Sequence, residues 1–257
     1  MRPYAETKRG VHPRDVAIYH RTNLPELQDK KWVWDLRGQE ALYLGGYDFR
    51  GKRVLEFGAA NGGLTFWMEQ QGAEVVGVDL SPDIARTSWD VLVGPEDNIA
   101  EMNRAMSTGT ERLNNGFWYG HEKLGSQAKL VHATAYELPD GIGRFDVVTL
   151  CAILLHLRDP MGALENAVSF TEKAIIINDA VPHFIPKEVQ HLPLAYFMPD
   201  KSRRRPHGGW TWWHITPEVY VHYLALKGFN VISNKTSSYE HASGTRELFT
   251  IVAERAP

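Results

Sequence analysis

The stretch VLEFGAANGGLTFWMEQQGAEVVGVDL, residues 54–80, decides the fold. An apolar run breaks at glycines, resumes with helical spacing and ends in a second apolar run that closes on Asp79. Strand, glycine turn, helix and strand in this order are typical of a nucleotide-binding unit in a parallel sheet. The glycine spacing resembles the dinucleotide fingerprint, but Ala60 and Asn61 crowd the place where a pyrophosphate approaches the backbone.

Two carboxylates flank this glycine turn. Asp79 follows Gly58 by about 20 residues and ends the second strand, where a carboxylate accepts hydrogen bonds from ribose hydroxyls. Glu56 ends the first strand and suits a cationic ligand group. S-adenosylmethionine has a ribose, a sulfonium and an amino group but no phosphate, so the pair favours it over a nicotinamide cofactor. A purely structural interpretation stays open, because the glycines also suit a tight turn and Asp79 a helix cap.

Short runs rich in Val, Ile and Leu repeat along the rest of the chain, separated by stretches with helical spacing. Such runs are typical of strands buried on both faces, and their alternation with helices indicates a parallel sheet. The expected strands cover 53–57, 73–79, 128–133, 145–150 and 174–179, followed by a closing pair at 229–233 and 246–254. The pattern therefore predicts an α/β, Rossmann-like fold, mostly parallel, with helices on both faces.

The chain divides into an arm and one main domain. Residues 1–46 are predicted to form an N-terminal arm with short helices, and residues 47–257 the main domain. About fifty residues separate the second and third expected strands, so we expect a helical insertion over about 90–127. A loop-rich segment over about 180–215 is predicted to cover the substrate.

Composition excludes several classes of protein. Of 257 residues, 43% are hydrophobic and 23% charged, which disfavours disordered and membrane proteins. The single cysteine, Cys151, excludes an internal disulfide and any cysteine-cluster metal site. We expect a cytoplasmic protein, a monomer or homodimer without membrane association, and the net charge of -3 gives no general attraction to nucleic acid.

The motifs together resemble those of class I S-adenosylmethionine-dependent methyltransferases. VLEFGAANGG is similar to their first motif, VVGVDLS to the ribose-binding strand end and FDVVTLCAILLHLRDP to the fourth-strand motif. YLGGYDFRGKRVLEFG, NNGFWYGHEKLGSQAKLVHATAYELP and WTWWHITPEVYVHYLALKGF more closely resemble the transfer RNA wobble-uridine carboxymethyltransferase-like family. The resemblance implies a seven-stranded sheet whose last strand is antiparallel.

The same resemblance implies a set of cofactor-binding residues. It places Asp79 at the ribose and Leu80 beside the adenine, and Thr134 stands where many relatives have an acidic residue near the adenine amino group. The other residues implied or expected near the cofactor are Glu56, Gly58, Ala60, Asn61, Gly62, Ala135 and Cys151. Ordinary S-adenosylmethionine is favoured over carboxy-S-adenosyl-L-methionine, which would need extra cations.

Methyl transfer to a hydroxyl or protonated amine requires removal of a proton, and two histidines are candidate catalytic bases. His156 follows the fourth expected strand, and His214 lies in WTWWHIT. A capping or packing role for His156 remains equally open, and His214 also suits an ordinary loop. Asn178 and Asp179 end the fifth strand, but no aspartate follows the fourth, so no metal site is predicted.

Cations and tryptophans gather in DKSRRRPHGGWTWWH. Trp210, Trp212 and Trp213 are candidate substrate residues together with Arg37. A small-molecule pocket is favoured, with methyl transfer to oxygen or nitrogen of a possibly natural-product acceptor. One alternative is modification of a transfer RNA wobble uridine, with bases stacked on the indoles. Another is a non-catalytic subunit that binds the cofactor and acts as a scaffold.

Overall fold

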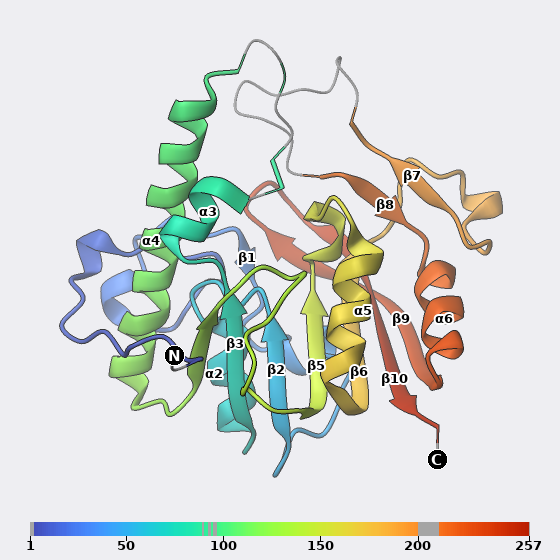
Figure 1. Cartoon of the computed structure of the whole chain (residues 1–257), viewed down its shortest axis with the longest axis horizontal. Helices are drawn as coiled ribbons and strands as arrows, with labels where there is room; N and C mark the ends of the chain where they lie inside the picture. Colours follow the sequence, from blue (N-terminus) through green and yellow to red (C-terminus); the bar gives the residue numbers. More distant parts are fainter. Residues whose placement is uncertain (1–2, 89, 92–93, 95–96, 200–210, 257) are drawn as a thin grey trace.

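The computed structural model describes residues 3–88, 90–91, 94, 97–199 and 211–256, in which one large sheet carries helices on both faces (Figure 1). The sheet has eight strands in the order β1-β9-β10-β6-β5-β2-β3-β4. Its strands are β1 (Trp34–Asp35), β2 (Arg53–Phe57), β3 (Glu74–Asp79), β4 (Lys129–His132), β5 (Phe145–Cys151), β6 (Thr171–Ala180), β9 (Phe229–His241) and β10 (Arg246–Arg255).

The central strands β4, β3, β2, β5 and β6 are parallel, and β10 pairs antiparallel with β6. These strands lie close to their predicted ranges because each is a compact run of branched aliphatic residues buried on both faces. The Rossmann-like α/β fold with an antiparallel last strand is therefore confirmed. The eighth strand, β1, comes from the N-terminal arm and pairs with β9 at the far edge.

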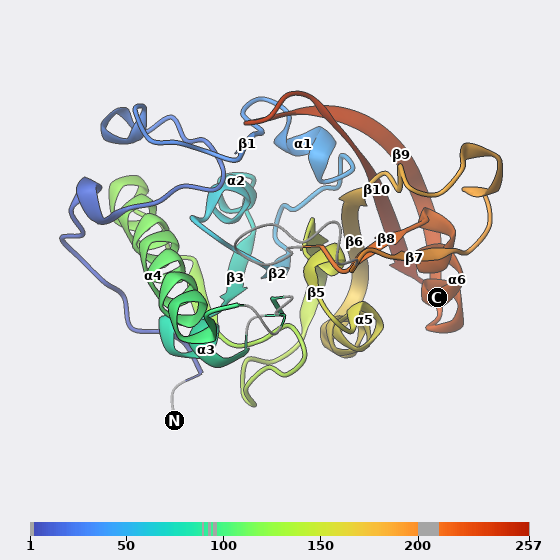
Figure 2. The ribbon, with the colours of Figure 1, turned by 90° about the horizontal axis from the view of Figure 1, so that it is seen from above.

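Helices pack on both faces of the sheet (Figure 2). On one face α2 (Gly63–Gln70) and α4 (Ile99–Leu124) share a core with Val54, Leu130 and Ile176. On the other face α5 (Pro160–Phe170) and α6 (Pro217–Leu226) bury their apolar sides against Leu55. Asp159 caps α5 by accepting a hydrogen bond from the Gly162 N–H at 2.8 Å.

The expected insertion over 90–127 is itself the crossover from β3 to β4. After the short α3 (Pro82–Ser88), α4 runs for 26 residues from its cap at Asn98 to Gly125. Phe117 and Trp118 of its C-terminal half are buried in the core beside α2. The segment is therefore part of the domain core, and only its N-terminal half extends past the carboxyl ends of the strands (Figure 1).

The N-terminal arm runs along the outer edge of the sheet and then over α2. It contains two short 3-10 helices (Pro13–Asp15 and Pro25–Leu27), β1 and α1 (Glu40–Tyr43). The Ala5 N–H donates to the Leu130 carbonyl at 2.8 Å, which protects the exposed edge of β4. Within the described residues, no helix is both long and apolar enough to cross a membrane.

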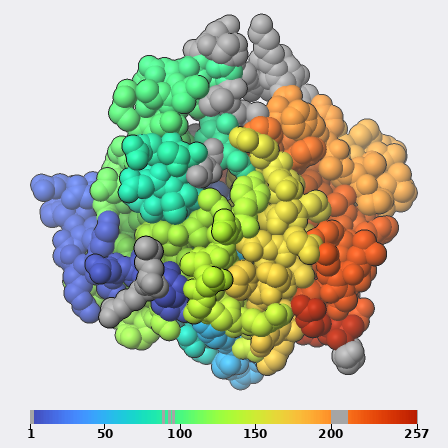
Figure 3. Space-filling model, in the orientation of Figure 1, coloured from blue at the N-terminus to red at the C-terminus, as the bar shows by residue number. Residues whose placement is uncertain are grey.

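Two further strands lie above the carboxyl ends of β5 and β6. β7 (Ala195–Phe197) and β8 (Trp213–Ile215) form a separate antiparallel pair, preceded by a 3-10 helix at Lys187–Val189. In Figure 3 this orange segment and the teal α3 lie at the same end of the molecule. The part of 180–215 that the structure describes thus includes β7 and β8, and a role in covering a substrate stays a prediction.

Candidate active site

The glycine turn after β2 holds an unusual backbone. Gly58 and Gly62 have φ values of 82° and 81°, which glycine adopts without strain. Ala60 has φ 49°, a left-handed conformation that costs an alanine about 1 kcal/mol or more. The Ala60 N–H donates to Asp79 Oδ2 at 2.6 Å, so the carboxylate at the end of β3 holds the strained residue in place.

Asp79 remains able to bind a ligand. Its Oδ1 accepts from the Leu80 N–H at 2.7 Å, so each carboxylate oxygen receives one backbone hydrogen bond and retains further acceptor capacity. The side chain is only partly enclosed. Desolvation raises its pKa, and the two backbone N–H groups oppose that rise. Asp79 can therefore accept hydrogen bonds from neutral hydroxyls above the end of β3.

Glu56 is a buried carboxylate without a cation. It is the second-last residue of β2, which pairs with the strand that carries Asp79. Its side chain is 1% exposed and accepts a hydrogen bond from the Thr65 hydroxyl of α2. Burial is the main reason that its pKa rises to about 8, and the Asp79 charge adds to the rise. No lysine or arginine among the described residues pairs with it. A cationic ligand group at this position would stabilise the ionised form.

The remaining expected cofactor residues lie at neighbouring strand ends. Leu80 follows Asp79, and its carbonyl accepts from Asn114 Nδ2 of α4 at 3.0 Å. Beyond β4, Thr134 is half-buried, and Ala135 is 8% exposed with its carbonyl bonded to a side chain of α5. Cys151 ends β5, where burial and the nearby Glu56 raise the pKa of its thiol well above the usual value. The thiol is therefore neutral at physiological pH.

Asn61 connects the glycine turn to the N-terminal arm. Its Oδ1 accepts from the N–H groups of Tyr19 and His20 at 2.9 and 2.8 Å, and its Nδ2 donates to the His20 carbonyl at 3.0 Å. Three hydrogen bonds thus hold this buried side chain to the arm. The Asn61 side chain therefore fixes the arm over the turn.

The two candidate bases lie on adjacent segments. His156 is half-buried in the 3-10 helix Leu154–His156 that follows β5, and His214 is half-buried on β8. The Trp212 N–H donates to the Leu155 carbonyl at 2.8 Å and joins these segments. A Cβ placed on Gly58 would lie 3.4 Å from Ile153 Cδ1, so the His156 segment also adjoins the glycine turn.

Trp212 and Trp213 are held by their indole N–H groups. Trp212 Nε1 donates to the Asp90 carbonyl at 2.6 Å and Trp213 Nε1 to the Arg158 carbonyl at 3.1 Å. The Asp90 carboxylate in turn accepts from the Arg158 N–H at 2.8 Å and from the Tyr136 hydroxyl. These contacts join the segments after α3, β4 and β5 to β8. Trp210, the third predicted tryptophan, lies outside the described residues.

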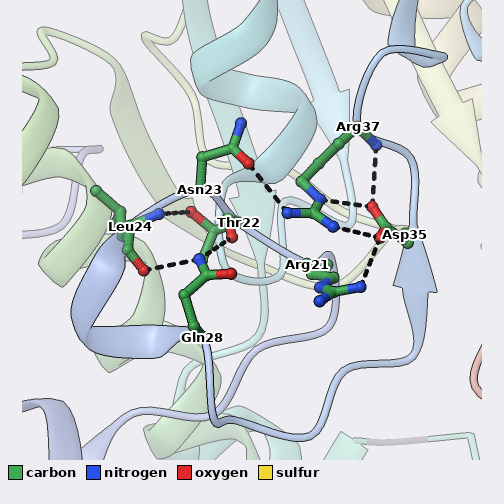
Figure 4. A network of polar contacts seen from close by, with 7 residues as sticks. All are labelled: Arg21, Thr22, Asn23, Leu24, Gln28, Asp35 and Arg37. Atoms are coloured by element: carbon green, nitrogen blue, oxygen red, sulfur yellow. Dashed lines mark hydrogen bonds and ion pairs between the residues drawn. The ribbon is translucent and has the colours of Figure 1, made fainter.

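Arg37 is engaged in a polar network of the arm (Figure 4). Its Nε and Nη2 donate to both oxygens of Asp35 at 2.8 and 2.7 Å, and its Nη1 donates to Asn23 Oδ1 at 3.1 Å. Arg21 also pairs with Asp35 at 3.0 Å, and hydrogen bonding by Arg37 lowers the pKa of that carboxyl. A substrate role for Arg37 would compete with this bidentate pair.

No group of three histidine, cysteine, aspartate or glutamate side chains suited to a metal occurs in the described part of the chain. Asn178 Nδ2 donates to Thr250 Oγ1 at 2.8 Å. Asp179 Oδ2 accepts from the Tyr220 hydroxyl at 2.8 Å, and burial raises the pKa of Asp179 to about 7. The side chains of Asn178 and Asp179 therefore have structural partners on opposite faces of the sheet.

Three residues of this site were not anticipated from the sequence. Thr65 is the partner of Glu56, Asp90 anchors Trp212, and His20 packs against the turn. Thr65 lies in the first turn of the helix that follows the glycine turn, so the local sequence already marks its position beside that turn. Asp90 and His20 gain their partners only through tertiary contacts, so no local pattern marks them.

Comparison with solved structures identifies the fold. The magnesium protoporphyrin IX methyltransferase of Synechocystis PCC 6803 with bound SAM superimposes with a TM-score of 0.53 at 16% identity, covering 86% of this chain and 78% of that chain. The 1,6-didemethyltoxoflavin-N1-methyltransferase of Burkholderia thailandensis gives 0.52 at 16% identity, with 87% and 82% coverage. A putative RNA methyltransferase of Pyrococcus horikoshii gives 0.51 at 13% identity, with 84% and 79% coverage.

Comparison of sequences identifies the family. A search of curated proteins found no match. Residues 35–233 match the family described as methyltransferase domain, a range that begins in β1 and includes the glycine turn, Asp79 and the His156 segment. With this match over most of its length, the chain belongs to the methyltransferase domain family.

Proposed function

We propose that this protein transfers the methyl group of S-adenosylmethionine to an oxygen or nitrogen of a small-molecule acceptor. The observation that carries the proposal is the pair Glu56 and Asp79 at the ends of adjacent strands around the glycine turn. One carboxylate is buried without a cation, and the other keeps acceptor capacity. A ligand with an ammonium group and a ribose fits both, so the residues present suit this cofactor.

Each cofactor-binding residue then has a defined role. Asp79 accepts hydrogen bonds from the ribose hydroxyls, Glu56 faces the ammonium, and Thr134 with the Ala135 backbone lies at the adenine. Gly58, Ala60 and Gly62 form the turn that gives the cofactor access to the strand end. Leu80 and Cys151 complete the walls. When bound, S-adenosylmethionine supplies a methyl group activated by its sulfonium, and the protein supplies alignment.

Proton removal from the acceptor is assigned to His156, with His214 as the second candidate. A neutral imidazole is suited to accept a proton near pH 7. The His156 segment adjoins the glycine turn and is bonded to the β8 segment through Leu155 and Trp212. A base on this segment lies beside the place proposed for the cofactor's reactive end.

The described tryptophans favour a small-molecule pocket over an RNA-stacking surface. The indole N–H groups of Trp212 and Trp213 are anchored to backbone carbonyls, so both rings are built into the cover of the strand ends. Two of the structural neighbours are named for small-molecule substrates, magnesium protoporphyrin IX and 1,6-didemethyltoxoflavin. The net charge of -3 also supports this choice.

Calorimetric titration of the purified protein with S-adenosylmethionine and S-adenosylhomocysteine tests the proposal. Binding of both is expected, and absence of binding would refute it. Mass spectrometry of any copurifying ligand separates the ordinary from the carboxylated cofactor. A metabolite extract incubated with a CD3-labelled donor should then yield a labelled small molecule. Labelled transfer RNA instead, with steeply salt-dependent binding, would favour the wobble-uridine alternative.

A further inference from the structure

Asp90 connects three segments beyond the carboxyl ends of the strands. Its Oδ2 accepts from the Arg158 N–H at 2.8 Å and from the Tyr136 hydroxyl. Its backbone carbonyl accepts from Trp212 Nε1 at 2.6 Å. The Asp90 side chain is 13% exposed, and the next residue, Val91, is 8% exposed. Asp90, Tyr136, Arg158 and Trp212 thus form one packed unit, which we name the Asp90 bridge.

Further contacts hold the Asp90 bridge together. The Arg158 guanidinium carbon lies 5.2 Å from the centre of the Trp212 ring, and the Asp159 N–H donates to the Tyr136 hydroxyl at 3.2 Å. Burial and the hydrogen bond to Asp90 raise the pKa of Tyr136, so its hydroxyl stays a donor at physiological pH. A hydrogen bond from a hydroxyl to a carboxylate is stronger than one between neutral groups. The Asp90 carboxylate is therefore the strongest acceptor in the bridge.

The bridge spans the sheet edge at which the cofactor is proposed to bind. Tyr136 directly follows Ala135, the proposed adenine neighbour, and comes after β4, whereas Arg158 comes after β5. In the sheet, β2 and β3 lie between β5 and β4. The contact between the segments after β4 and β5 therefore spans the ends of the strands that carry Glu56 and Asp79. Figure 1 shows α3 and β8, which the bridge also connects, at this end of the sheet.

We propose that Asp90 is a positioning residue that keeps the segments after α3, β4 and β5 closed over the cofactor, so that opening of the bridge sets the rate of cofactor exchange. This inference rests on the proposed function. Asp90 acts through Tyr136, Arg158 and Trp212. The bridge consists of protein groups alone, so the same hydrogen bonds break when a ligand enters and when it leaves. Asp90 therefore slows both steps and has little influence on affinity.

Stopped-flow fluorescence with S-adenosylhomocysteine tests the proposal. This ligand has no methyl group to transfer, so its association and dissociation rates report exchange without turnover. Asp90→Ala removes both hydrogen bonds of the carboxylate, and Tyr136→Phe removes one donor but keeps the ring. Tyr223→Phe is the matched control, because it also removes a hydroxyl that donates to a carboxylate, that of Glu165, on the outer side of α5 and α6.

Asp90→Ala is expected to raise both rates by roughly 10-fold or more, as for loss of a hydrogen bond to a charged group. Its Kd should stay within about threefold of that of the unaltered protein, because the two rates change together. Tyr136→Phe should raise both rates on its own but have little further effect in the Asp90→Ala background, since both changes remove the same hydrogen bond. Tyr223→Phe should leave both rates unchanged.

Unchanged rates in an Asp90→Ala variant that still binds S-adenosylhomocysteine would overturn the inference. A loss of affinity with an unchanged association rate would also overturn it, because Asp90 would then stabilise the bound state. Tyr136→Phe decides the question if Asp90→Ala does not fold, and unchanged rates in that variant count against the bridge in the same way. If the unaltered protein does not bind S-adenosylhomocysteine, the proposed function itself fails and the inference falls with it.

Discussion

Raising the pH from 6 to 7 should tighten binding of S-adenosylhomocysteine about ninefold, and Glu56→Gln should abolish this dependence. In the free protein, burial raises the pKa of Glu56 to about 8, so the carboxyl is mostly protonated at pH 7. A ligand ammonium beside it favours the ionised form and lowers the pKa in the complex. Binding therefore releases a proton, and affinity rises with pH until the carboxyl is ionised in the free protein.

The magnitude follows from the fraction ionised before binding. With a pKa of about 8, that fraction is about 1% at pH 6 and about 9% at pH 7, which gives the ninefold change and a release of about 0.9 proton at pH 7. The ligand amino group is an amino-acid ammonium next to an ionised carboxylate, so it stays protonated between pH 6 and 7. The Cys151 thiol does not titrate here, because its pKa is raised well above its usual value.

Calorimetry at several pH values, in buffers with different ionisation enthalpies, measures both affinity and proton release. Glu56→Gln keeps the size of the side chain and an oxygen for the Thr65 hydroxyl. Its affinity should be lower and nearly independent of pH between 6 and 7, with little proton release. A pH-independent affinity in the unaltered protein, without proton release, would refute the placement of Glu56 beside an ammonium.

Three further changes have expected outcomes. Asp79→Ala should weaken cofactor binding by about 1 to 3 kcal/mol through lost hydrogen bonds to the ribose, and unchanged calorimetric affinity would contradict the ribose assignment. Burial raises the pKa of Asp179 to about 7, so the folded state binds its proton more tightly than the unfolded chain. Its contribution to stability is present below the unfolded pKa near 3.8 and is lost as pH rises through about 7, at up to about 1.4 kcal/mol per pH unit. In urea unfolding Asp179→Asn should reduce this slope, and an unaltered slope would exclude Asp179 as its source. Gly63→Ala should lower the unfolding free energy by about 1 to 3 kcal/mol, because the new Cβ would lie 2.5 Å from His20 Cβ. The control Gly109→Ala, in open space on α4, should be neutral or stabilise by up to about 1 kcal/mol, and equal losses for both would rule out the contact as the cause.

The central sheet could be predicted from the sequence because its signals are local. Each parallel strand is a short aliphatic run, and the glycine turn fixes where β2 ends and α2 begins. Glu56 and Asp79 lie near the carboxyl ends of two expected parallel strands. Parallel pairing brings these ends together, so the proximity of the two carboxylates could be predicted. The proposed cofactor end of the site is therefore largely encoded between residues 54 and 80.

Other features depend on contacts between distant segments. β1 has only two residues, which is too few to show the alternation of side chains that marks a strand in a sequence. Its partner, β9, lies some two hundred residues later. The sequence predicts Asn61 at the cofactor from its place in the turn, and only the structure adds that its amide binds the arm at Tyr19 and His20. The crossover helix α4 resembled an insertion because its polar N-terminal half precedes the buried aromatic residues that anchor it.

The arm and the glycine turn constrain one another, which explains why both are packed so tightly. Gly63 leaves no room for a side chain next to His20, and Gly116 of α4 would bring a Cβ to 2.5 Å from the Ala17 carbonyl. The arm therefore passes between α4 and the turn at backbone distance, and Asn61 fixes its register. A shift of the arm by one residue would replace His20 with Tyr19 or Arg21 at the start of α2. These glycines thus help to set which side chain of the arm packs against the start of α2.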